Sequence, residues 1–273
     1  MGTGRGSRRN DRGVALLIAL LVMALLMALV MEFAYGTRVS MRAAANFRDG
    51  RKAEHLARSG VNVAGKILAA LLDPTINKPQ DSLEQREWQV VPVMTGGDTE
   101  LRVRWEDEAG KIHIANVSTG QKSLGRLERL FGDLGISLEV LDRMKERRSF
   151  NILDELHQVM SDEEFGKVRD LITVFGSDMI DVNTAPALVL QSLGLSATQA
   201  SMIVEGRNRG PYTDKANIPG YEALGPTVQG ALVITSNLFT VHSHATVGGY
   251  TKQAEAVISR SPGGFTILSM KVL

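Results

Sequence analysis

An uninterrupted apolar run near the start of the sequence predicts a membrane-spanning helix. Residues 14–31 are all apolar, and Arg12 and Gly13 come directly before them. At about 1.5 Å per residue the run makes a helix roughly 27 Å long, which nearly matches a hydrocarbon core of about 30 Å. Because a backbone in hydrocarbon must satisfy its own hydrogen bonds, we expect this run to be helical and inserted in a membrane.

The residues after this run continue a helical pattern on one face. Residues 39–72 contain no proline, and apolar or small residues recur there every three or four positions. This spacing places them in one stripe along a helix. Asp73-Pro74 ends the pattern, because proline disfavours helix in the residue before it. The sequence therefore predicts one helix of roughly 90 Å, with a stripe of Ala53, Leu56, Ala57, Gly60, Val61, Ala64, Ile67, Leu68 and Leu71.

Strand patterns lie on both sides of a central helical block. Residues 101–105 alternate apolar and charged side chains, as half-buried strands do. The valine-rich segment 88–94 contains Pro92, which favours an edge strand. After a turn at 107–110, residues 111–117 are expected to return as the next strand. Three further strands are predicted late in the chain, separated by glycine-rich turns, at residues 239–247, 253–260 and 265–272.

The block from about residue 124 to 233 is predicted to be helical and contains one recognisable unit. Asn183 or Thr184 can accept hydrogen bonds from free N–H groups at a helix start, and Pro186 suits a first turn. Two helices are expected to follow, joined by a hairpin that contains Gly194. The unit, residues 181–212, resembles a helix-hairpin-helix.

Helix-hairpin-helix units often bind DNA by pointing hairpin N–H groups at a phosphate. This hairpin reads Gly194-Leu195-Ser196, so the second glycine of the usual Gly-x-Gly is missing. Arg207 and Arg209 remain as possible phosphate contacts, but a solvated charged rim is the favoured interpretation. We therefore expect the unit to pack on protein and expect no nucleic acid as a partner.

Charge and cysteine content add weak limits. A net charge of +1 over 273 residues argues against chain-wide attraction to nucleic acid. The segment before the apolar run is basic, as cytoplasmic flanks are, but Arg38, Arg42 and Arg48 follow the run, so charge alone does not fix the orientation. The chain has no cysteine, so its stability must come from its core.

Three interpretations of the N-terminal segment remain open. A secretory signal peptide would be cut near residues 34–36, although its apolar region is normally about 7–15 residues. A plain signal anchor fits the length. The third interpretation is a prepilin leader of residues 1–13, cut between Gly13 and Val14, because residues 12–17 resemble a prepilin peptidase site. In that case the apolar run stays in the mature protein.

The chain as a whole resembles protein K of the general (type II) secretion pathway, a minor pseudopilin. The resemblance rests on residues 13–18, on Glu32-Phe33-x-Tyr35-x-x-Arg38, and on Ala53-x-x-Leu56-Ala57-x-x-Gly60-Val61. Residues 107–116 and the segment Ile-Asp-Val-Asn-Thr-Ala-Pro at 180–186 extend it over most of the chain.

This resemblance implies an α+β fold with a helical spine and an inserted all-α domain. The spine would be residues 14–73. A pilin-like antiparallel sheet would come from residues 74–118 and 234–273, and helix-hairpin-helix (SAM-like) units would fill the insert at 119–233. The protein would be single-pass in the inner membrane, with its C-terminal domain in the periplasm, and would be processed by prepilin peptidase and methylated.

The resemblance also implies a place at the tip of the pseudopilus, where the subunit nucleates assembly with the minor pseudopilins of types I and J. The major pseudopilin and the inner-membrane assembly platform would be further partners. Most pilins carry glutamate at the fifth mature position, which is Ile18 here. A carboxylate in hydrocarbon costs about 2.5–3.5 kcal/mol, and pilins pair it with the N-terminal amine of a neighbour. Without that carboxylate, the subunit has no such tie to a subunit ahead of it.

Small residues on the spine favour close helix packing. The expected filament-packing residues are Ala15, Ile18, Ala19, Ala24, Ala28, Glu32, Ala53 and Ala57.

No pattern in the sequence indicates an enzyme or a resident cofactor. His242 and His244 share one face of a strand without a third metal ligand, and the acidic run 106–108 is interpreted as a solvated turn. Some family members bind calcium near an Asp-Trp-x-Asp-x-Asp stretch, which this sequence lacks, so calcium is doubtful. The alternative function is a membrane-tethered DNA receptor of the competence type, which would need a flexible linker between anchor and hairpin.

Overall fold

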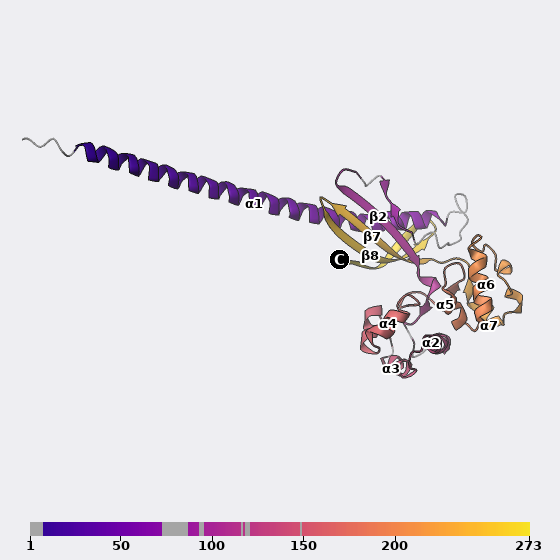
Figure 1. The fold of residues 1–273 in the computed structure, drawn as a ribbon. Coiled ribbons are helices and arrows are strands. Elements are labelled where there is room, and N and C mark those ends of the chain that lie inside the picture. The colour runs from indigo at the N-terminus through magenta and orange to yellow at the C-terminus, as the bar shows by residue number, and fades with distance from the viewer. Residues whose placement is uncertain (1–7, 73–86, 93–95, 116, 118–120, 148) are drawn as a thin grey trace, which may run out of the picture. The chain divides into compact units, whose positions relative to one another are not determined.

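The computed structural model describes residues 8–72, 87–92, 96–115, 117, 121–147 and 149–273. The chain divides into two compact units, residues 1–52 and residues 53–273. Helix α1 (Arg8–Ala70) makes up the described part of the first unit and contributes its last turns to the second (Figure 1). The predicted α+β class, with a long N-terminal helix and an antiparallel sheet, is confirmed.

Local sequence explains why α1 continues beyond its apolar part. Alanine, leucine, arginine and methionine, which are strong helix formers, dominate it. Thr37 and Ser59 donate their hydroxyl protons to carbonyls four residues back, so these polar side chains remain compatible with the helix. Arg58 and Glu54 form an ion pair one turn apart, at 3.2 Å. Asp73-Pro74, the predicted stop, lies outside the described residues.

The second unit contains a five-stranded antiparallel sheet in the order β1-β2-β7-β8-β9. Val103 of β2 lies opposite Ser243 of β7, and Val241 of β7 lies opposite Ala256 of β8. The chain leaves this sheet after β2 and returns to it at β7. The strands are β1 (Gln89–Val90), β2 (Thr99–Asp107), β7 (Leu238–Val247), β8 (Tyr250–Ser261) and β9 (Gly264–Val272).

The last turns of α1 pack on one face of the sheet at very short range. Ala57, Val61, Ala64 and Leu68 form a core with inward side chains of the strands, including Leu101, Val103, Phe239 and Val241. A Cβ at Gly60 would lie 2.1 Å from Ser243 Oγ, and a Cβ at Gly65 would lie 2.6 Å from the Phe265 ring. Glycine at these two positions therefore allows the helix to approach the sheet.

The predicted strand at 111–117 is wrong as a member of this sheet. The 3₁₀ helix η3 (Glu108–Gly110) turns the chain away, and Asp107 caps it by accepting from Ala109 N. Only β3 (Ile112–His113) follows, and it pairs in parallel with β4 (Ile172–Thr173). Of the strand predicted at 88–94, β1 covers two residues, and residues 93–94 lie outside the described part.

Between β2 and β7 the chain builds a second hydrophobic core from helices. Phe131, Phe150 and Leu141 are among its fully buried side chains. The short strands β5 (Ile180–Asp181) and β6 (Leu232–Val233) pair in parallel, and Ile180 and Leu232 belong to this core. The helices are α2 (Gln121–Leu134), α3 (Glu139–Arg147), α4 (Asp162–Val168), α5 (Ala187–Ser192), α6 (Ala197–Arg207) and α7 (Pro226–Ala231), with 3₁₀ turns η4 (Leu153–Gln158), η5 (Lys215–Asn217) and η6 (Tyr221–Ala223).

Candidate functional site

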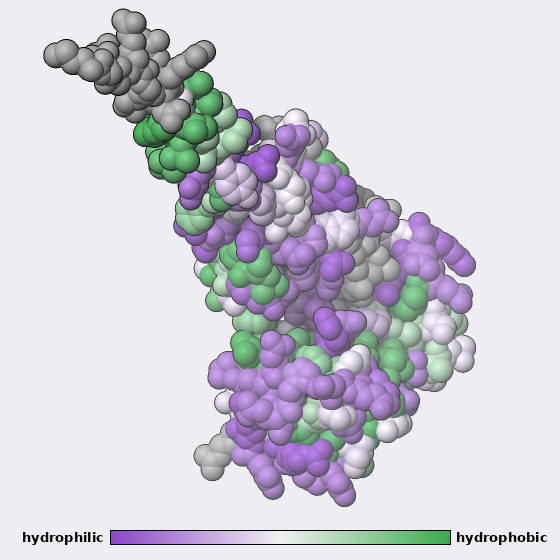
Figure 2. Space-filling model, turned by 60° about the vertical axis from the view of Figure 1, so that its left-hand side comes forward, coloured by the Kyte–Doolittle hydropathy of each residue, from purple (hydrophilic) through white to green (hydrophobic). Residues whose placement is uncertain are grey.

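The apolar part of α1 exposes hydrophobic side chains on every side. From Val14 to Met31 the large apolar residues keep between 46% (Val22) and 70% (Leu21) of their surface accessible. A helix of a soluble domain buries one apolar stripe, whereas a helix that is apolar all round belongs in a membrane or inside other protein. In Figure 2 the visible surface of α1 next to its grey tip is hydrophobic. Among the described residues, α1 alone is long and apolar enough to cross a membrane.

The predicted processing and packing residues of this segment lie on the exposed helix. Gly13, at the expected cleavage site, is exposed, and Ile18 keeps 57% of its surface accessible. Ala15 and Ala19 are one turn apart, as are Ala24 and Ala28, and at about 100° per residue the two pairs face nearly opposite sides of the helix. Glu32, also exposed, is the first carboxylate after the apolar run. If these alanines pack closely against other helices, as predicted, two separate faces of α1 would do so.

Two residues assigned to filament packing are placed differently by the structure. Ala53 and Ala57 have no accessible surface, and Ala57 belongs to the core between α1 and the sheet. The stripe from Ala57 onward is covered by the chain's own strands, and neither alanine has surface left to contact a partner in this fold. The filament-packing assignment of Ala53 and Ala57 is therefore wrong, whereas that of the apolar segment stays a prediction.

The expected helix-capping residues at 183–186 have other roles. Asn183 Nδ2 donates to the carbonyls of Tyr212 and Ile234, each at 3.0 Å, and its Oδ1 accepts from Tyr212 N at 2.8 Å. Thr184 donates to a carboxylate of β2, at 2.5 Å. Pro186 itself occupies the N-cap of α5, without a side-chain capping bond. Capping by Asn183 or Thr184 is therefore wrong, because both side chains bind segments that are distant in sequence.

The hairpin between α5 and α6 has its own local determinants. Gly194 has φ +101°, a conformation that favours glycine. Ser196 caps α6, and its hydroxyl accepts from Gln199 N while the Gln199 side chain accepts from Ser196 N. Two N–H groups at this helix start, those of Ser196 and Gln199, thus have partners within the chain.

Arg207 is not part of a solvated rim, which corrects the sequence-based interpretation. Its Nη1 donates to the carbonyls of Val182 and Ala185, at 2.8 and 2.7 Å. The guanidinium therefore ties the end of α6 to the segment before α5. Arg209 is exposed.

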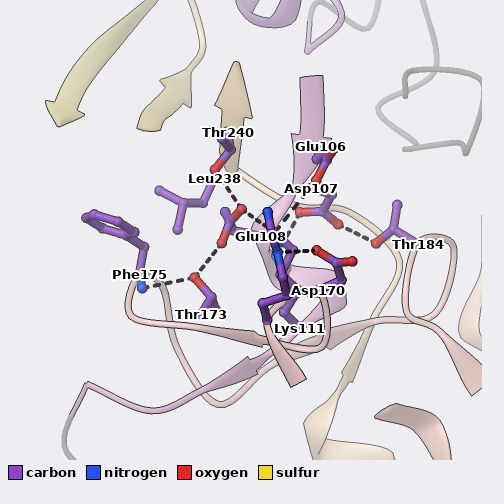
Figure 3. Close-up of polar contacts among 12 residues, drawn as sticks. Glu106, Asp107, Glu108, Lys111, Asp170, Thr173, Phe175, Thr184, Leu238 and Thr240 are labelled. Atoms are coloured by element: carbon purple, nitrogen blue, oxygen red, sulfur yellow. Dashed lines mark hydrogen bonds and ion pairs between the residues drawn. The ribbon is translucent and has the colours of Figure 1, made fainter. Parts of the chain in front are cut away.

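The acidic run 106–108 is the largest departure from expectation. Asp107 and Glu108 keep 3% and 4% of their surface accessible, so a solvated turn is wrong for both. Asp107 Oδ2 accepts from Thr184, at 2.5 Å. Glu108 Oε1 accepts from Lys111 Nζ at 2.7 Å and from Thr240 Oγ1 at 2.6 Å, and its Oε2 accepts from Thr173 (Figure 3).

These two carboxylates join the sheet to the helical segment. Thr240 belongs to β7, Thr173 to β4, and Thr184 to the turn before α5. Burial raises the pKa of Glu108, but the charge of Lys111 and the three hydrogen bonds outweigh it, so the pKa lies below its usual value. Glu108 therefore stays ionised, and this junction fixes how the helical segment is held on the sheet.

The two histidines of β7 lie on the outer face of the sheet. His242 lies 3.9 Å from a Glu106 oxygen and 3.7 Å from a Glu255 oxygen. Burial lowers its pKa more than these carboxylates raise it. His244 packs against Trp88, with ring centroids 4.2 Å apart. Within the described parts of the chain, no three His, Cys, Asp or Glu side chains gather as metal ligands would.

Comparisons with known proteins find similarity among solved structures only. No family model and no curated protein sequence matches this chain. Among solved structures, it is similar to a chain in the crystal structure of the GspK-GspI-GspJ complex from the type 2 secretion system of enterotoxigenic Escherichia coli. The match has a TM-score of 0.62 and 16% sequence identity, and covers 87% of this chain and 99% of that chain. The protein therefore has the fold of a chain in this complex.

Proposed function

We propose that this protein is a minor pseudopilin of protein K type, at the tip of a type II secretion pseudopilus. The observation that carries the proposal is the fold match over 99% of a chain from the GspK-GspI-GspJ complex. The motifs at residues 13–18 and 180–186 support the same assignment from the sequence. The function is mechanical, since the protein would nucleate filament assembly for protein export across the outer membrane.

The apolar segment of α1 would have two roles, first as a membrane anchor and then as a packing surface in the filament. Before assembly, residues 14–31 anchor the protein in the inner membrane with the C-terminal unit in the periplasm. During assembly the same side chains pack against the spines of minor pseudopilins I and J, and later of the major pseudopilin. Exposure of apolar side chains all round the helix supports both roles, because one surface serves lipid first and protein afterwards.

The helical segment would set the position in the filament. We propose that residues 119–233 form a domain inserted into the pilin-like sheet, and that its bulk prevents a further subunit from stacking above. The junction of Asp107 and Glu108 supports this role, since it holds the segment on the sheet through buried hydrogen bonds. Ile18→Glu should supply the carboxylate of ordinary pilins, and cross-linking should then find a subunit ahead of this one. Continued restriction to the tip would contradict the role given to Ile18.

Mass spectrometry of the N-terminus tests the proposal against the other interpretations of the leader. Protein purified from membranes of cells that contain prepilin peptidase should begin at Val14, with a methylated amine. A Gly13→Asp variant should keep its leader, and an Ala34→Asp variant, altered at the alternative cleavage site, should be processed normally. An intact leader in the wild type, or a start at Thr37, would contradict the pilin proposal.

A further inference from the structure

Two adjoining hollows form a cleft between α2 and α7 in the helical segment. Their volumes are about 180 and 410 Å³. Both are lined by Lys122, Arg126, Thr227 and Ala231. The smaller also reaches Leu193, directly after α5, and the larger reaches the loop at 177–179.

Three basic side chains of α2 line this cleft. Lys122, Arg126 and Arg129 are spaced by four and three residues, so they share one face of the helix. Arg126 is almost fully buried, with 5% of its surface accessible, and its Nη1 donates to the carbonyl of Asp178, at 2.6 Å. Arg129 donates from Nη1 to the carbonyl of Ser192, at 2.7 Å. Each arginine is thus held at the cleft by a backbone carbonyl.

The cleft contains more positive than negative charge. Among its described lining residues the one carboxylate is Asp178, whose Oδ1 accepts from Ser123 at 2.7 Å. Burial lowers the pKa of Arg126, Asp178 raises it, and the neighbouring charge of Arg129 lowers it further. A buried guanidinium with a second cation beside it is a group that a bound anion would stabilise.

We propose that this cleft binds an oxyanion, either a carboxylate or a phosphate group. Guanidinium N–H groups form a planar fork that matches such oxygens, and charge-assisted hydrogen bonds are the strong ones. Lys122 adds a mobile ammonium at the cleft, and the Thr227 hydroxyl on the opposite wall is a further donor. The inference goes beyond the filament role and does not depend on it.

The cleft can be filled without changing any charge. A Cβ at Gly125 would meet no heavy atom within 4 Å, so a larger side chain there has room and would extend into the hollow. Gly132 lies on the same helix, also has open space, and does not line the cleft. Gly125→Leu and Gly132→Leu are therefore a matched pair, and both should favour the helix. Arg126 is left unchanged, because its bond to the Asp178 carbonyl supports the fold.

Isothermal titration of the full-length protein in detergent tests the proposal, with inorganic phosphate and a short peptide bearing a free C-terminal carboxylate as separate probes. We expect saturable binding of at least one probe. Lys122→Gln should weaken it about tenfold, as expected for the loss of a charged hydrogen bond. Gly125→Leu should abolish it, and Gly132→Leu and Lys66→Gln should leave it unchanged.

The two probes distinguish the source of the oxyanion. Binding of phosphate alone indicates a phosphate ligand, and binding of the peptide alone indicates a carboxylate presented by a protein. Failure of both probes to bind would overturn the proposal, as would binding that Gly125→Leu and Lys122→Gln leave intact. Salt-dependent binding of duplex DNA without binding of either small probe would also overturn it, and would favour a nucleic-acid surface instead.

Discussion

At the scale of single residues, buried carboxylates hold the second unit together. Asp107 and Glu108 look like a solvated turn in the sequence, because nothing local shows their partners. The hydroxyls that bind Glu108 come from residues 65 and 132 positions away, and the one that binds Asp107 is 77 positions away. Such contacts depend on the folded arrangement, which explains why local pattern could not predict them.

Glu108 should make the free energy of unfolding fall at acid pH. The pKa of Glu108 is lower in the folded chain than in the unfolded chain, so the folded state binds fewer protons. The stability that Glu108 contributes is therefore fully present above its unfolded-state pKa and is lost as the pH falls through its folded-state pKa. Denaturation of the full-length protein between about pH 5 and 2 should show this loss. Glu108→Gln should destabilise by roughly 1–3 kcal/mol near neutral pH and flatten the acid dependence. Glu128→Gln, on the exposed face of α2, is the control, and an unchanged acid slope in Glu108→Gln would contradict the role of Glu108.

Gly60 should be required by the contact between α1 and the sheet. Alanine favours helix over glycine by about 1 kcal/mol, but overpacking typically costs about 1–3 kcal/mol, and the new Cβ would lie 2.1 Å from Ser243 Oγ. We therefore expect Gly60→Ala to lower the free energy of unfolding.

Ser243 Oγ is buried without a hydrogen-bond partner among the described residues, so Ser243→Ala should be nearly neutral and should partly rescue Gly60→Ala in a double-mutant cycle. Gly166→Ala, in open space on α4, should not destabilise.

At the scale of elements, α1 has two parts with different environments. Its first part is apolar on all sides and exposed, whereas its last turns bury one stripe under the strands. The sequence predicts both patterns, because each has a clear helical period. It does not show what covers the second stripe, so the pattern alone equally favours a partner at Ala53 and Ala57. Likewise, alternation of Ile112 and Ile114 predicts burial correctly, but in the helical core and not in the sheet.

A charge at Ala57 should unfold the second unit. Ala57→Glu would bury an unpaired carboxylate against the sheet, at a cost of about 3–5 kcal/mol, which is a large part of the stability of a typical domain. Asn62→Glu adds the same charge on the exposed side of the same helix and should be tolerated. Limited proteolysis and circular dichroism of the two full-length variants compare them. A folded Ala57→Glu protein that has lost only its partners would restore the filament-packing role of this residue.

At the scale of the whole molecule, the sequence predicts more of the architecture than of the candidate sites. The strands β7, β8 and β9 and the long helix follow from strong periodic patterns near their observed bounds. The roles of Asn183 and Thr184 could not be predicted, because their partners Tyr212, Ile234 and Asp107 come together only in the fold. The basic cleft could not be predicted either, since three charges on one helix face look like ordinary solvated residues as long as the facing wall of α7 is unknown.

The most direct test of the filament role is site-specific photo-cross-linking of the full-length protein in cells that express minor pseudopilins of types I and J. A photoreactive residue at Ala24, on the apolar part of α1, should cross-link to at least one of them, because the helix would pack there against partner spines. The same residue at Leu138, exposed on the helical segment, is the control and should give no such product. If position 24 gave no cross-link to either subunit while the protein was folded and present in the membrane, the minor pseudopilin account would be contradicted.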